Sequence, residues 1–308
     1  MRLIVLVALA LACGSSASVG QERLRIVATT TDLKSLTEEV GGDRIEVVSM
    51  VPPATNAEDY QPKPQDAVRL KGAALVVRVG LDYDLWFDRL LTNAGLTQNH
   101  VRGLRRGEEG HVDASTGIAV LEIRGIAVGP SDGHAHGSGN PHYWLDPKNA
   151  EIITAYILEA LARADPPNMA YYEANRVAFL ARLERKLAEW TARLAPLQGR
   201  PIVAYHNSWA YLARRFRLNI VGFIEPRPGV PASPSHLADL LRLMREQDVR
   251  MIVRQVYEPE KDARFLADKT GAAVIQLAGS VGALPAASDY LALFDADVEA
   301  LLAGQAGQ

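Results

Sequence analysis

The sequence predicts an α/β protein of two β/α domains, each with a largely parallel sheet, joined by one long rigid helix. Short apolar runs alternate with segments of helical periodicity in both halves of the chain, which is typical of βαβ units. The run from Asn168 to Leu197 has helical spacing and contains no glycine or proline before Pro196. A length of 308 residues fits two domains, at roughly 150 residues per domain.

The N-terminus predicts export from the cytoplasm. Residues 1–20 combine one arginine, an apolar run from Leu3 to Cys13 and a stretch of small residues. This pattern is typical of a secretory signal peptide, because a spanning helix needs about 18 or more apolar residues. We expect cleavage after Ala17 or Gly20 and a periplasmic or extracytoplasmic location.

Cys13 is the only cysteine, at the end of the apolar run. A bacterial lipoprotein carries its lipidated cysteine at such a place, although Ala10-Leu11-Ala12 fits the usual lipobox poorly. The alternative is a small apolar residue that is removed with the peptide. In either case the mature protein has no disulfide and no free thiolate ligand, so any metal site must use histidines and carboxylates.

The composition is that of an ordinary globular protein and excludes few classes of protein. Hydrophobic residues make up 48% and charged residues 22% of the chain. The formal net charge is -3, and lysines and arginines are spread along the chain. We therefore expect no nucleic-acid partner.

The N-terminal domain is expected to span residues 21–165 and to contain three clear strands. Predicted strands are Leu24 to Thr29, Ile45 to Val51 and Ala74 to Gly80, and predicted helices are Asp32 to Gly42, Pro62 to Ala73, Tyr83 to Gly95 and Lys148 to Ala164. The glycine-rich region from Thr97 to Asn140 is weakly periodic. We expect loops there, with one strand around Gly117 to Ile123.

A linking helix over residues 166–198 would span roughly 40 Å at ~1.5 Å per residue, and the C-terminal domain follows over residues 199–308. Its predicted strands are Arg200 to His206, Asn219 to Glu225, Val249 to Val256 and Ala272 to Leu277, and its predicted helices are Ser208 to Leu218, Ser233 to Gln247, Pro259 to Gly271 and Ser288 to Ala303. Ser233 or Ser235 is suited to cap the second of these helices.

Polar side chains at strand ends predict a metal site. Glu58 follows the second strand, His142 precedes a helix, and His206 and Glu225 end neighbouring strands of the second domain. Ligands of open parallel sheets collect at the carboxyl ends of strands and in clefts between domains. Two histidines with one or two carboxylates would suit a divalent transition metal in the interdomain cleft.

Each of these residues also has a simpler interpretation. His206 alone could bond the backbone, and Glu58 or Glu225 could be an exposed loop charge. His142 has the best local support, because Asp146 and Pro147 are a natural helix start that fixes the preceding loop. His100, His111 and His236 lie in polar contexts and are expected to be structural or solvent-facing.

The chain resembles the metal-binding substrate-binding proteins of ABC importers, the zinc/manganese group of the ZnuA, TroA and PsaA type. The resemblance covers essentially the whole mature chain. The motifs that carry it are AEDYQPKPQD (57–66), LVVRVGLDYDLWFDRLL (75–91), NPHYWLDPKNA (140–150), YHNSWAYLARRFRL (205–218) and FLADKTGAAVIQL (265–277). His142 and His206 stand in the family's ligand places.

Two departures concern the ligand set that the resemblance implies. Glu58 stands where the family commonly has its first ligand histidine, and residues 278–280 lack the carboxylate that often supplies a fourth ligand. Glu225 is the candidate for the fourth position, with water as its rival and Asp289 as a third choice. A carboxylate in place of a histidine shifts the set toward Mn²⁺ or Fe²⁺, but Zn²⁺ also binds such a set well.

The resemblance implies a receptor that is not an enzyme, and that passes a divalent ion to an ABC transporter membrane permease. We expect Zn²⁺ as the transported ligand, with Mn²⁺ as the alternative, and a monomer that changes shape only modestly. His134 and His136 lie in a Gly/Ser run and resemble a shortened auxiliary His-rich loop; the alternative is a solvated loop. Rival functions are an adhesin on the same fold or a metal-dependent hydrolase, although no HExxH motif or nucleophile elbow is present.

Overall fold

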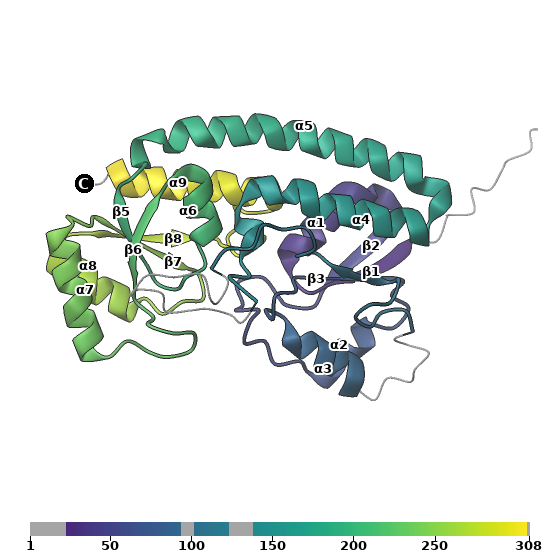
Figure 1. Cartoon of the computed structure of the whole chain (residues 1–308), viewed down its shortest axis with the longest axis horizontal. Helices are drawn as coiled ribbons and strands as arrows, with labels where there is room; N and C mark the ends of the chain where they lie inside the picture. The colour runs from purple at the N-terminus through teal and green to yellow at the C-terminus, as the bar shows by residue number, and fades with distance from the viewer. Residues whose placement is uncertain (1–22, 94–101, 123–137, 307–308) are drawn as a thin grey trace, which may run out of the picture.

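The computed structural model describes residues 23–93, 102–122 and 138–306. The predicted signal peptide over residues 1–20 with Cys13, and the histidines His100, His134 and His136, lie outside these residues. Within them the fold class predicted from the sequence is confirmed. Two α/β domains, each with an all-parallel sheet, lie side by side under one long helix (Figure 1).

The first sheet has the strand order β2-β1-β3-β4. Its strands are β1 (Leu24–Ala28), β2 (Ile45–Ser49), β3 (Leu75–Arg78) and β4 (His111–Asp113). Its helices are α1 (Thr31–Gly41), α2 (Pro64–Arg69), α3 (Leu85–Asn93) and α4 (Ala150–Ala164). The central strands β1 and β3 are almost wholly apolar because helices and loops bury both faces of the sheet.

The second sheet repeats this topology with the order β6-β5-β7-β8. Its strands are β5 (Pro201–Ala204), β6 (Asn219–Phe223), β7 (Met251–Gln255) and β8 (Ala273–Leu277). Its helices are α6 (Ala210–Phe216), α7 (Pro234–Glu246), α8 (Lys261–Thr270) and α9 (Tyr290–Ala306). Ser233 caps α7 by accepting a hydrogen bond from the backbone N–H of His236, one of the two caps expected.

The long helix α5 (Met169–Leu194) runs along the top of both domains in Figure 1. It packs on α1 and α4 of the first domain and on α9 of the second. At ~1.5 Å per residue its 26 residues span roughly 39 Å. Such a helix braces the two domains against each other.

The strand expected around Gly117 to Ile123 is absent from the described part of that segment, through Glu122. The sheet instead gains the short strand β4, where Val76 and Val77 of β3 pair with His111 and Val112. The apolar residues of this segment pack in the core without forming a strand of the sheet; Ile118, for example, is buried.

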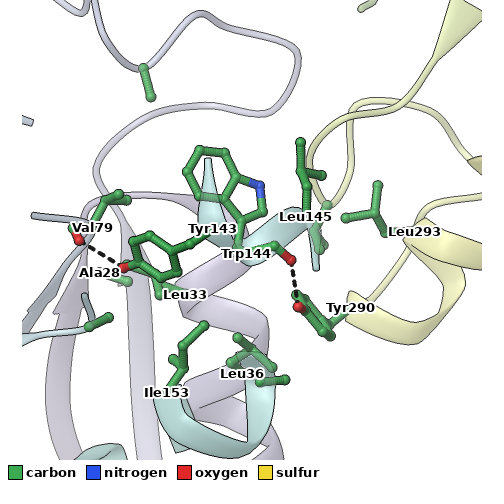
Figure 2. Packing of buried hydrophobic residues seen from close by; sticks show 14 of the residues in the cluster. Ala28, Leu33, Leu36, Val79, Tyr143, Trp144, Leu145, Ile153, Tyr290 and Leu293 are labelled. Atoms are coloured by element: carbon green, nitrogen blue, oxygen red, sulfur yellow. Dashed lines mark hydrogen bonds between the residues drawn. The ribbon is translucent and has the colours of Figure 1, made fainter. Parts of the chain in front are cut away.

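The larger of two buried hydrophobic clusters among the described residues runs through both domains. Leu33 of α1 and Leu293 of α9 belong to the same buried cluster. Figure 2 shows the Tyr290 hydroxyl of α9 donating to the backbone oxygen of Trp144, at 2.6 Å. Because breaking this continuous core would expose apolar surface to water, the packing opposes a wide hinge motion.

Buried carboxylates hold the loop between β8 and α9, and one of these bonds crosses between the domains. The backbone N–H of Val281 donates to Asp32 of α1 at 2.9 Å, and that of Ala278 donates to Asp297 of α9 at 2.6 Å. The loop between β8 and α9 is therefore held from both domains. Among the described residues, no helix has the length and apolar character that crossing a bilayer requires.

Candidate metal centre

Three side chains from separate loops meet between the domains. Glu58 lies between β2 and α2, His142 precedes α4, and His206 follows β5. One potential ligand atom from each lies within 4.8 Å of the other two. Nε2 of His142 is 3.6 Å from Oε1 of Glu58, and Nε2 of His206 is 3.9 Å from Oε2 of Glu58. Two imidazole nitrogens and one carboxylate thus surround one point.

Local contacts fix the loop that carries Glu58. The indole N–H of Trp86 donates to the backbone oxygen of Ala57 at 2.8 Å, and Tyr60 packs edge-on against Trp86. The backbone N–H of Glu58 donates to Asn56. Asp59, the other acidic residue here, is exposed and contacts Asn56. Only Glu58 of this acidic pair therefore joins the histidines.

His142 is buried and held at one ring nitrogen. Its backbone N–H and its Nδ1 both contact the side-chain oxygen of Asn140, at 3.0 and 3.1 Å. Tyr83 packs edge-on against the ring, with centroids 5.4 Å apart. Because Nδ1–H donates to Asn140, Nε2 carries the lone pair and faces Glu58, which is the tautomer that a metal ligand requires.

The predicted helix start after His142 is present. Asp146 accepts a hydrogen bond from the backbone N–H of Lys148, and the chain then enters a 3₁₀ turn over Pro147–Asn149 before α4. Both Asp146 carboxylate oxygens also accept from Arg215 of α6, at 2.6 and 2.8 Å. The segment that follows His142 is therefore tied to the helix that follows His206.

His206 is held at Nδ1 by Glu225. The Glu225 Oε2 atom lies 2.5 Å from Nδ1, and Glu225 Oε1 accepts from the backbone N–H of Gly229 at 2.8 Å. Both oxygens of Glu225 therefore have partners on the side of the ring away from Glu58. The structure does not bring Glu225 into the group of three.

The other suggested sources of a fourth ligand also lie elsewhere. Asp289 caps α9 by accepting from the backbone N–H groups of Leu291 and Ala292. In the loop after β8, Gly279 has φ of 67°, and a Cβ there would lie 2.3 Å from the Gln255 side-chain oxygen. A side chain at Gly279 would thus meet both backbone strain and a clash.

A polar network that the sequence did not predict links the two histidine loops. Asn140 donates to Glu122 at 3.0 Å and to the backbone oxygen of Asn207 at 3.0 Å, and Asn207 donates to Glu122 at 2.8 Å. Asn140 and Asn207 are almost fully buried. The available signal was an asparagine beside each histidine, in NPH and HN.

Electrostatics at His206 favour a bound cation. Burial lowers the pKa of His206, but the hydrogen bond with Glu225 and the charge of Glu58 outweigh burial and raise the pKa above its usual value. A proton on this ring would be stabilised by the same carboxylates that would stabilise a metal ion. His111 and His236 contact backbone oxygens, of Leu104 and Phe223, which agrees with a structural role.

Two parallel-sheet domains braced by one helix, with a His–His–carboxylate cluster between them, define the class of metal-binding substrate-binding proteins of ABC importers. The family model of ZnuA, the periplasmic component A of a zinc-uptake complex, matches residues 26–304. The chain belongs to this family, whose members are substrate-binding proteins of ABC transporters and are not enzymes.

Named relatives cover most of the chain. The iron-binding protein YfeA of Yersinia pestis is 25% identical over 295 residues, which is 92% of this chain and 86% of YfeA. The manganese ABC transporter substrate-binding lipoprotein PsaA of Streptococcus pneumoniae is 26% identical over 247 residues, 78% of this chain and 74% of PsaA. A crystal structure of ZnuA superposes with a TM-score of 0.76 at 27% identity, covering 93% of this chain and 100% of that one.

Proposed function

We propose that this protein captures one divalent transition-metal ion with Glu58, His142 and His206 and delivers it to the membrane permease of an ABC importer. The convergence of three potential ligand atoms within 4.8 Å carries the proposal. It is supported by the oxygen partner at Nδ1 of each ring, which orients both Nε2 atoms toward Glu58.

We assign Glu225 a supporting role in place of the fourth-ligand role expected from sequence. A carboxylate on Nδ1 orients the His206 ring and raises the basicity of Nε2, an arrangement common around metal-bound histidines. The fourth position is then left for water, the rival expected from the sequence. One ligand carboxylate and one supporting carboxylate together offset the charge of a divalent ion.

Zn²⁺ is the metal that we propose, with Mn²⁺ as the alternative. Two imidazoles, one carboxylate and a water suit tetrahedral zinc. Mn²⁺ prefers more oxygen ligands and binds an equivalent site more weakly in the Irving–Williams order. The relatives include an iron-binding and a manganese protein, so the choice among metals requires measurement.

The metal would exchange by local movement of a ligand loop. The continuous core and the tie between Tyr290 and Trp144 oppose separation of the domains. The Glu58 loop is the accessible element, because its residues Pro52, Pro53 and Asp59 are exposed to solvent. We further propose that residues 1–20 export the chain as a signal peptide and that it acts as a monomer in the periplasm. Lipid attachment at Cys13 is the alternative to cleavage after Ala17 or Gly20.

Metal analysis of the purified protein tests the proposal. Competition with a chromophoric chelator should show one tightly bound Zn²⁺ per chain, with Mn²⁺ bound more weakly. His142→Ala and His206→Ala should each lose this binding, whereas Asp59→Ala, a matched change of the exposed neighbour of Glu58, should keep it. Tight binding that survives both histidine substitutions would refute the ligand assignment.

A further inference from the structure

A pocket of about 390 Å³ opens beside the three-residue cluster on the side of the second domain. Glu58 and His206 contribute to its wall, so it shares two residues with the candidate metal centre. Two more carboxylates, Glu225 and Glu258, also line it, and the lining contains no lysine or arginine among the described residues. The pocket is thus a negatively charged space next to the cluster.

Glu258 stands at the same edge of the sheet as His206. It follows β7, the strand that pairs with β5, and His206 follows β5. Its Oε2 atom accepts a hydrogen bond from the backbone N–H of Gln255 at 2.6 Å, which fixes the side chain. The residue is only 5% exposed. Carboxyl ends of adjacent parallel strands are where ligands of such sheets bind.

The second oxygen of Glu258 has no hydrogen-bond partner. Oε1 is buried, and the described residues offer it no donor. Arg254, the nearest guanidinium on the same strand, donates instead to the backbone oxygens of Gln255 and Glu258, at 3.0 and 2.9 Å. A buried carboxylate oxygen without a donor is costly, and such a group commonly serves a ligand or an ion.

Burial favours the protonated form of Glu258. Burial raises the pKa of Glu258 to about 7, against the lowering effects of the Gln255 N–H, His206 and Arg254, while Glu225 raises it further. A cation at the free oxygen would displace the proton and stabilise the ionised carboxylate. The wall of the pocket is therefore suited to a positive ligand.

We propose that this pocket is a second, weaker site for a hydrated divalent cation, with the free Oε1 of Glu258 as its protein ligand. The inference rests on the proposed function, since the ion held here would be the one that passes to His206 and Glu58. Oxygen ligands suit a cation that keeps most of its water. Six waters at ~30 Å³ each need roughly 180 Å³, which the pocket of about 390 Å³ contains.

Mn²⁺ binding to protein already loaded with Zn²⁺ tests the second site. One equivalent of Zn²⁺ fills the tight site, and Mn²⁺ does not displace it because zinc binds more tightly. Loss of the free Mn²⁺ electron paramagnetic resonance signal at pH 8 then counts further binding. Wild type should bind one Mn²⁺ with a dissociation constant of about 10⁻⁴ to 10⁻³ M, as for weak oxygen-ligand sites.

Glu258→Gln should abolish this Mn²⁺ binding while keeping one tight Zn²⁺. The amide oxygen of glutamine can still accept from Gln255, so the fold is retained. Glu246→Gln, an exposed carboxylate at the end of α7, is the matched control and should bind Mn²⁺ as wild type does. Unchanged Mn²⁺ binding in Glu258→Gln, or none in wild type, would overturn the inference.

A measurement on the wild type does not depend on any variant folding. Substoichiometric Mn²⁺ should broaden the amide resonances of Gln255 and Tyr257 in the zinc-loaded protein before those of α5. Uniform broadening would reject the site. If wild type bound no tight Zn²⁺ at all, the proposed function would fail, whereas tight Zn²⁺ without the Mn²⁺ effect would reject the second site alone.

Discussion

Replacing Glu225 by glutamine separates a supporting role from direct metal binding. In the structure one Glu225 oxygen accepts from His206 Nδ1 at 2.5 Å, and the other accepts from the Gly229 N–H at 2.8 Å. A glutamine has one oxygen and one NH₂ group, so it can satisfy only one of these two donors. The substitution also removes the negative charge behind the imidazole.

The expected loss follows from these contacts. Substitution of an outer partner of a metal-bound histidine typically weakens metal affinity about 10- to 100-fold, or about 1.4 to 2.7 kcal/mol. Loss of a ligand costs more. A structural zinc site of four ligands is worth about 10 to 16 kcal/mol, or roughly 2.5 to 4 kcal/mol per ligand. His206→Ala should therefore weaken binding several times more than Glu225→Gln.

Competition for Zn²⁺ with a chromophoric chelator at pH 7.5 measures both variants, with Glu246→Gln as the control for loss of one acidic charge in the same domain. A deficit for Glu225→Gln equal to that of His206→Ala would make Glu225 a ligand. Affinity equal to wild type would show that the contact with His206 does not matter for binding.

Three other expectations follow from single contacts. The pKa of His206 is raised, so protons compete with the metal for this ring at pH values above the usual imidazole pKa. Zinc affinity should therefore fall as pH drops from 8 to 6, and an affinity that does not change with pH in the chelator assay would contradict this. Burial raises the pKa of Asp297 from 3.8 to about 7, so the folded state holds the proton more tightly and stability is lost as pH rises toward 7. Asp297→Asn should thus raise the free energy of unfolding by about 1 to 4 kcal/mol at pH 8 and by little near pH 3, where both states hold the proton; equal gains in denaturant titrations at the two pH values would reject this. Tyr290→Phe should cost about 1 kcal/mol of stability through its lost bond to Trp144, with zinc affinity unchanged, and a large affinity loss would show that the domains move apart on binding.

The fold could be predicted because the strands are buried on both faces. Runs such as Leu75 to Val77 are apolar throughout, and helices with clear stops separate them. Strand β4 was not predictable because it has only three residues, with a histidine and an aspartate around Val112. Its conformation depends on pairing with β3, a long-range contact that the local sequence does not reveal. The apolar run near Ile118 was mistaken for the strand for the same reason.

The residues of the candidate site could be predicted where they lie at the ends of strands. His206 and Glu225 follow adjacent strands, so the sequence indicated that they are neighbours. It could not show which ring nitrogen the carboxylate meets, because that depends on side-chain rotamers and on the Gly229 turn. Glu258 was missed although it follows β7 in the same way, and the strand-end rule would have found it there. Glu122 had no local signal at all.

The coordination of zinc in the loaded protein tests the central claim most directly. X-ray absorption at the zinc edge, on protein with one equivalent of Zn²⁺, should show two imidazole nitrogens at about 2.0 to 2.1 Å and oxygen ligands at about 2.0 to 2.2 Å, without sulfur. The imidazole signal should disappear when His142 and His206 are both replaced by alanine. A wild-type spectrum with oxygen ligands alone, or an imidazole signal that survives the double substitution, would contradict the account.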